Sequence, residues 1–146
     1  MRKLIFLCIF VASCSQADTD DRIRQLQTSD LYEKGSQCHG SFFRIDHSNF
    51  YFIDGKNVRT LAISAKFIAD NNGVILSEKR GQFQMNTHII FNTPDNSVRI
   101  SDITLLPEPS SAQWTILKNE TGMGLKEFRI YHDRLQSAPT LELCAR

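Results

Sequence analysis

The sequence predicts an all-β fold: a mainly antiparallel meander of eight or nine strands, curled into a barrel-like sheet, with a short helical segment at the N-terminal side. Apolar and polar residues alternate over several stretches, which is typical of strands with one buried and one wetter face. Turn residues separate these stretches by connections too short for a parallel crossover, so neighbouring strands are expected to be antiparallel. A two-sheet β-sandwich is the alternative architecture.

The helical segment is expected before the strands, in short pieces over residues 20–34. Ile23 and Leu26 fall on one helical face, Ser29 is suited to cap a second turn, and Gly35 is suited to end it. This segment should pack against the curled sheet.

Four stretches alternate clearly enough to be predicted as strands: residues 43–46, 60–67, 83–92 and 127–132. In each of them, every second residue is mostly apolar, as the two-residue period of a strand requires. In the last stretch Phe128, Ile130 and His132 share the apolar register.

Turn chemistry fills the gaps between the strands. Asp54-Gly55 and Asn72-Gly73 suit two-residue hairpin turns, because Gly and Asn accept positive φ. Arg80-Gly81 and Pro94-Asp95-Asn96 supply further reversals, and Gly122-Met123-Gly124 is expected at another hairpin tip. A longer loop over residues 107–111 follows from Pro107 and Pro109, which no central strand would accommodate.

The first residues indicate an export signal. The basic Met1-Arg2-Lys3 precedes an apolar run from Leu4 to Ala12, which is far shorter than the roughly 20 residues of a membrane-spanning helix. A buried N-terminal helix is the alternative interpretation. We therefore expect a signal peptide over residues 1–13, a polar and acidic tether over 14–21, and a single β-rich domain over 22–146.

The end of the signal resembles the lipobox of bacterial lipoproteins, in the residues Val11-Ala12-Ser13-Cys14. The resemblance implies that Cys14 becomes an acylated N-terminus that anchors the protein in the cell envelope, facing the periplasm. Ser15 after the cysteine is compatible with the outer membrane. The alternative is cleavage after Ala17, at Ser15-Gln16-Ala17, which would release a soluble secreted protein.

Either cleavage leaves two cysteines that can pair. Cys8 leaves with the signal, and Cys14 is acylated or removed, so Cys38 and Cys144 remain in an oxidising compartment. We predict a disulfide between them; two unrelated free thiols are the alternative. No metal site is predicted, because neither cysteine belongs to a CxxC pair and only His39 lies close in sequence.

The charge distribution argues against nucleic-acid binding. The chain has 17 basic and 16 acidic residues; without Arg2 and Lys3 the balance is 15 to 16, a net charge of −1. After the signal, Lys79-Arg80 is the only adjacent basic pair. Phosphate recognition needs a clustered positive face, which this sequence does not indicate.

No catalytic residue, metal ligand set or cofactor site is predicted. The histidines His39, His47, His88 and His132 form no HxH or HExxH spacing, and no GxSxG or phosphate-binding loop occurs. Asp46-His47 and His132-Asp133 are neighbours in sequence, but adjacent side chains of a strand point to opposite faces. An enzyme is therefore not the favoured class.

An aromatic cluster is the one unusual surface candidate: Phe42, Phe43, Phe50, Tyr51 and Phe52. Consecutive aromatics place rings on both faces of a strand. One interpretation is core on one face and helix cover on the other. The other interpretation is a partner-binding patch of Phe42, Phe50, Tyr51 and Phe52.

These observations favour a non-catalytic protein-interaction or accessory module of the cell envelope, anchored by acyl chains and binding another envelope or secreted protein. The lipobox at Cys14, Cys38 with Gly40, and Cys144 together are similar to small periplasmic lysozyme inhibitors, which would imply an inhibitory binding function. That family's Ser-Ala-Ser-Gly stretch is replaced by Ile63-Ser64-Ala65-Lys66. A lipocalin-like carrier with an apolar ligand inside the barrel is a further alternative.

Overall fold

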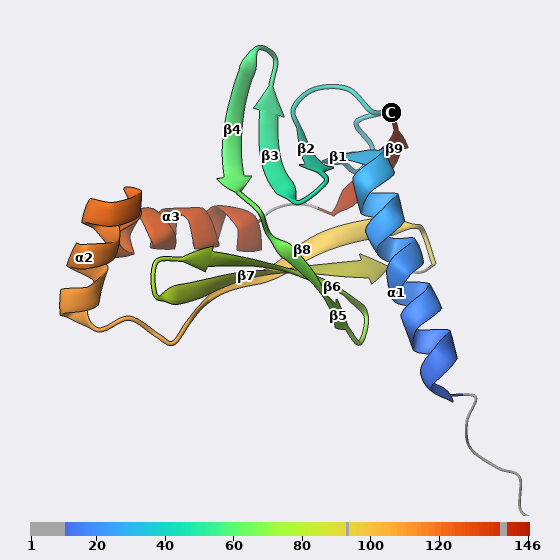
Figure 1. Cartoon of the computed structure of the whole chain (residues 1–146). Helices are drawn as coiled ribbons and strands as arrows, with labels where there is room; N and C mark the ends of the chain where they lie inside the picture. The colour runs from blue at the N-terminus through green and yellow to red at the C-terminus, as the bar shows by residue number, and fades with distance from the viewer. Residues whose placement is uncertain (1–10, 93, 138–139) are drawn as a thin grey trace, which may run out of the picture.

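The structure is a computed structural model that describes residues 11–92, 94–137 and 140–146 (Figure 1). In chain order the elements are α1 (Val11–Thr28), β1 (Ser29–Glu33), β2 (Phe42–Asp46), β3 (Asn49–Asp54), β4 (Asn57–Ala62), β5 (Lys66–Asp70), β6 (Gly73–Arg80), β7 (Phe83–Asn92), β8 (Ser97–Leu106), α2 (Ser111–Thr121), α3 (Leu125–Gln136) and β9 (Leu141–Ala145).

All nine strands belong to one antiparallel sheet with the order β4-β3-β2-β1-β9-β8-β7-β6-β5. The predicted meander is confirmed, because β1 to β4 and β5 to β8 each pair in sequence order and β9 joins β1 to β8. The barrel-like sheet is not closed, because β4 and β5 lie at its opposite ends and no pairing between them occurs in the described residues. The alternative of a two-sheet sandwich is wrong, because the described strands form one sheet.

The alternation of the sequence places the core on one face of the curled sheet. In β7, residues Phe83, Met85, Thr87 and Ile89 are buried, while the residues between them are partly or fully exposed. Registered neighbours continue this inner face, with Ile103 opposite Thr87 and Leu76 on its other side. The predicted turn at Asp54-Gly55 is present, and Gly55 adopts a positive φ of 57°. The turn predicted at Asn72-Gly73 lies one residue earlier, because Gly73 already pairs with Asp70 as the first residue of β6.

The predicted strand over residues 60–67 is two strands. β4 ends at Ala62 and β5 begins at Lys66, with a bend between them where Ser64 has a φ of 53°. Apolar and polar residues keep alternating across this bend, and for that reason residues 60–67 were predicted as a single strand. The bend carries the chain from one edge of the sheet to the other.

The N-terminal helix α1 is one continuous element rather than short pieces, and the expected second turn at Ser29 is instead the start of β1. Its Leu26 is fully buried, and α1 packs against β1, β2, β5, β6 and β9. The interior of the curled sheet is therefore filled by helix and core side chains such as Phe50 and Ile45. Among the described residues, no helix is long and apolar enough to cross a membrane.

The prediction of a strand over residues 127–132 is wrong, because these residues belong to α3. Phe128 contacts Trp114 of α2 at 5.4 Å between ring centroids and His132 at 6.1 Å, one helical turn away. Gly122-Met123-Gly124 joins two helices and is not a hairpin tip. Gly122 ends α2 in the left-handed conformation, and Ser110 begins it with a capping box.

Helix α3 lies beside β8, where the sheet is incompletely paired. Within the described residues, β9 pairs with β8 only at Ser97 and Val98, and α3 packs along β8 (Figure 1). His132 approaches Asp102 of β8 at 3.6 Å. The helix thereby covers the part of β8 that β9 leaves open.

Candidate functional site

Cys14, the residue predicted to be lipidated, lies within the first half of α1. Residues 1–10 of the expected signal lie outside the described residues. The expected tether over 14–21 is part of the same helix, which reaches a buried residue at Thr19. The segment after Cys14 is therefore helical.

The predicted disulfide is present. Cys38, between β1 and β2, is bonded to Cys144 of β9, with 6.0 Å between the Cα atoms. The carboxylate of Glu142 lies within 4.8 Å of both sulfurs, the only grouping of this kind among the described residues. Both sulfur atoms are bonded to each other in the disulfide and are not thiolate ligands. The carboxylate of Glu142 accepts hydrogen bonds from the hydroxyl of Ser36 and the backbone N–H of Cys38, each at 3.3 Å.

The predicted aromatic patch divides between the two faces of the sheet. Phe50 is fully buried and Phe43 and Phe52 share its inner face, as their registered pairing requires. Phe42 and Tyr51 point to the outer face. The grouping of Phe42, Phe50, Tyr51 and Phe52 into one patch is therefore wrong, because strand alternation separates its members.

A different apolar row crosses the outer face. The pairings of β1 to β4 align four side chains, which we call the outer row: Tyr32, Phe42, Ile53 and Val58. Tyr32 and Phe42 stack at 4.9 Å between ring centroids, and Val58 is 63% exposed. Among the described strands β4 pairs with β3 alone, so the row ends at an edge strand of the sheet.

An ion-pair network lies beside the outer row. Asp30 of β1 accepts two hydrogen bonds from Arg44, at 2.8 and 2.6 Å, and one from Arg146 at 3.0 Å. Arg44 also lies over the Phe42 ring, 5.1 Å from its centroid. Burial raises the pKa of Asp30, but the hydrogen bonds and charges of the two arginines outweigh it and hold the pKa below its usual value.

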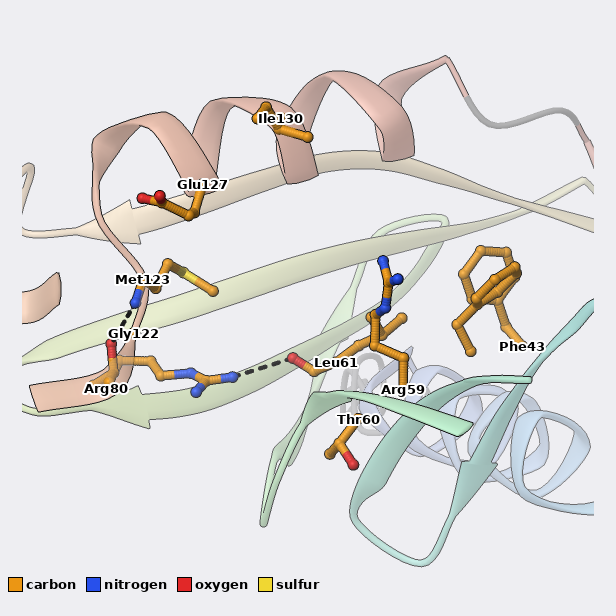
Figure 2. A pocket seen from close by; sticks show the side chains of 11 residues that line it. Phe43, Arg59, Thr60, Leu61, Arg80, Gly122, Met123, Glu127 and Ile130 are labelled. Atoms are coloured by element: carbon orange, nitrogen blue, oxygen red, sulfur yellow. Dashed lines mark hydrogen bonds between the residues drawn. The ribbon is translucent and has the colours of Figure 1, made fainter. Parts of the chain in front are cut away.

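A pocket of about 580 Å³, here called the cleft, opens on the inner side of β4 (Figure 2). One wall comes from β2, β3 and β4, and the other from α3 and the turn that precedes it. The lining residues are Phe43, Phe52, Arg59, Thr60, Leu61, Arg80, Thr121, Gly122, Met123, Glu127 and Ile130. Of these residues, only Phe43 and Phe52 belong to the aromatic cluster that the sequence singled out. The others come from distant parts of the chain and meet only in the folded structure.

Side chains from β6 bridge the gap between β4 and β5, here called the seam. Glu78 accepts a hydrogen bond from the backbone N–H of Ile63 at 3.0 Å, and Arg80 donates to the Leu61 carbonyl at 3.2 Å. Glu78 and Arg80 also form an ion pair at 3.0 Å. Glu78 is 5% exposed, and this burial raises its pKa, offset only in part by Ile63 and Arg80.

The histidines form local pairs with carboxylates. Contrary to the strand-based expectation, His47 contacts Asp46 at 2.8 Å, because His47 lies in a turn with a φ of 53°. In α3, His132 contacts both Asp133 and Asp102, and His88 lies 3.7 Å from Asp70. The His47 side chain is 93% exposed, so this pair lacks the water exclusion that strengthens catalytic electrostatics.

No family model, curated protein or solved structure matches this chain.

Proposed function

We propose that this chain is a membrane-anchored lipoprotein of the bacterial cell envelope that acts as a non-catalytic accessory module and binds another envelope or secreted protein through the outer row. The anchor would be Cys14 with its acyl chains, facing the periplasm from the outer membrane. Processing after Ala17 would instead give a soluble secreted form of the same module.

The observation that carries the proposal is the continuity of the outer row with the free edge of β4. Four apolar side chains cross four strands, and the most exposed of them, Val58, lies on the edge strand. Exposed apolar rows that reach an unpaired edge are typical of protein-interaction surfaces, because a partner strand gains backbone hydrogen bonds and apolar contacts together.

The position of α1 supports a partner close to the membrane surface. The buried Thr19 lies five positions after Cys14 in the same helix. At about 1.5 Å per residue, that helical distance is roughly 7–8 Å. An anchor at Cys14 would therefore hold the folded domain near the lipid headgroups, where a partner in the same membrane would meet it.

The two edge strands offer a matched test. Val58 of β4 and Ile68 of β5 are both exposed β-branched residues, 63% and 43% exposed, at opposite edges of the sheet. Affinity isolation from gently solubilised envelopes should recover one defined protein with the wild-type chain and with Ile68→Lys. The same protein should be lost with Val58→Lys. Equal recovery with both variants, or recovery of the chain alone, would contradict the proposal.

The anchor is tested separately by Cys14→Ala. We expect this variant to leave the membrane fraction, because it cannot carry acyl chains. A variant that stays bound to the membrane and is processed after Ala17 would show that Cys14 is not the anchor.

A further inference from the structure

The cleft has a composition that the outer row does not share. Its walls are mainly apolar, with Phe43, Phe52 and Leu61 from the sheet on one side and Met123 and Ile130 on the other. Figure 2 shows the sheet residues and the α3 residues facing one another across the opening. Its volume of about 580 Å³ lies within the range of pockets that bind small organic ligands.

One charged group in the cleft is available to a ligand. Figure 2 shows Arg59 extending from β4 into the cleft, close to Phe43. Arg59 is exposed, and within the described residues no hydrogen bond or ion pair engages its guanidinium group. A free guanidinium beside aromatic rings presents donors that match a carboxylate.

The other two charged lining residues already have partners. Arg80 pairs with Glu78 at 3.0 Å, and Glu127 lies 3.6 Å from Lys118 and accepts from the Gly124 backbone N–H at 3.1 Å. The unpaired charge of the cleft is therefore positive. An apolar cavity with one free positive charge is complementary to a molecule that has an apolar body and one anionic end.

The seam keeps the cleft preformed. Arg80 and Leu61 line it, and the hydrogen bond between them ties β4 to β6 at the base of the sheet-side wall. The hydrogen bond from the backbone N–H of Ile63 to the Glu78 carboxylate holds the segment that follows β4 against β6. A preformed site loses less conformational entropy on binding.

We propose that the cleft binds a single-chain amphipathic carboxylate, such as a medium-chain fatty acid, with its carboxylate on Arg59 and its alkyl chain against the apolar walls. Each buried methylene contributes roughly 0.8 kcal/mol, so the alkyl chain supplies most of the affinity and Arg59 selects the charge. Val58 and Arg59 are adjacent in β4 and point to opposite faces. This site is therefore separate from the outer row, and either proposal can fail without the other.

The test is isothermal titration calorimetry with the full chain carrying Cys14→Ala and an intact Cys38–Cys144 bond, so that neither acyl chains nor detergent compete. The probes are dodecanoate, dodecan-1-ol and dodecyltrimethylammonium, all below micelle formation. We expect dodecanoate to bind at micromolar concentration, at least tenfold more tightly than the cationic probe.

Variants separate the charge from the cavity. Arg59→Gln should weaken dodecanoate binding about tenfold and leave dodecan-1-ol unchanged, whereas Arg99→Gln, at an exposed arginine on β8, should change neither. Ile130→Glu, at a 46% exposed position, should weaken dodecanoate more than dodecan-1-ol. Circular dichroism checks that each variant is folded. Equal binding of the anionic and cationic probes, no effect of Arg59→Gln, or no dodecanoate binding would overturn the proposal.

Discussion

Asp30 in β1 accepts a hydrogen bond from Nε of Arg146 at 3.0 Å, across 116 residues of sequence. Arg44 of β2 binds the same carboxylate, so one acidic group joins β1, β2 and the residue that follows β9. Arg146 also donates to the carbonyls of Ile45 at 2.6 Å and Ser29 at 3.3 Å. This network fixes the middle of the sheet, beside the outer row.

Replacing Arg146 with Ala should lower the free energy of unfolding by about 1–2 kcal/mol, since hydrogen bonds to charged groups contribute amounts of this size. The loss leaves the buried Asp30 carboxylate with Arg44 alone. Chemical denaturation measures the effect, and Arg99→Ala, which removes an exposed arginine from β8, is the control. Equal stabilities of the two variants would show that the Arg146 contacts contribute nothing.

The pH dependence of stability should reveal Glu78. Because burial raises its folded-state pKa above the ordinary 4.5, the folded protein binds this proton more tightly than the unfolded chain. Its contribution to stability is therefore most favourable at pH below 4.5 and is lost as pH rises through the raised pKa. The stability of the wild type relative to Glu78→Gln should increase as pH falls from 7 toward 4.5.

Denaturation curves of both proteins at several pH values measure this difference. A difference that stays constant across that range would mean that the Glu78 carboxyl has an ordinary pKa and that the seam is not a buried charge site. The Gln variant has no carboxyl group to titrate at this position, so the pH dependence of the difference comes from Glu78 and includes its ion pair with Arg80.

The disulfide should contribute strongly to stability, because its ends are 106 residues apart. Constraining a loop of about 100 residues stabilises by up to roughly 4–5 kcal/mol in the chain-entropy model. The double variant Cys38→Ser and Cys144→Ser should unfold at correspondingly lower denaturant concentration. The wild type in reductant should match the double variant; a reduced protein as stable as the oxidised one would contradict this.

The sequence predicted the strands well where both faces of the sheet have distinct environments. The alternation of β7 was recognisable because Phe83, Met85 and Ile89 face the core while Gln84 faces solvent. The pairing of Cys38 with Cys144 was predicted from the expected export signal, since either predicted cleavage leaves only these two thiols to pair. These features depend on local pattern or on counting, which one sequence contains.

The errors concern features that depend on long-range contacts. In α3, Phe128 and Ile130 are two residues apart, as in a strand, but only Phe128 packs on the core and Ile130 is 46% exposed. Barrel closure depends on whether β4 and β5 pair, and the bend at Ser64 carries no clear signal. The cleft was missed for the same reason, because Arg59 and Met123 meet only through the topology.

Site-specific photocrosslinking in intact cells tests the central claim most directly, because it reports contacts of the outer row in the native envelope. A benzophenone amino acid would replace Val58 or, as the matched control at the opposite edge, Ile68. We predict a light-dependent adduct of one defined larger mass from position 58 and none from position 68. No adduct from position 58, or the same adducts from both positions, would contradict a binding function of this face.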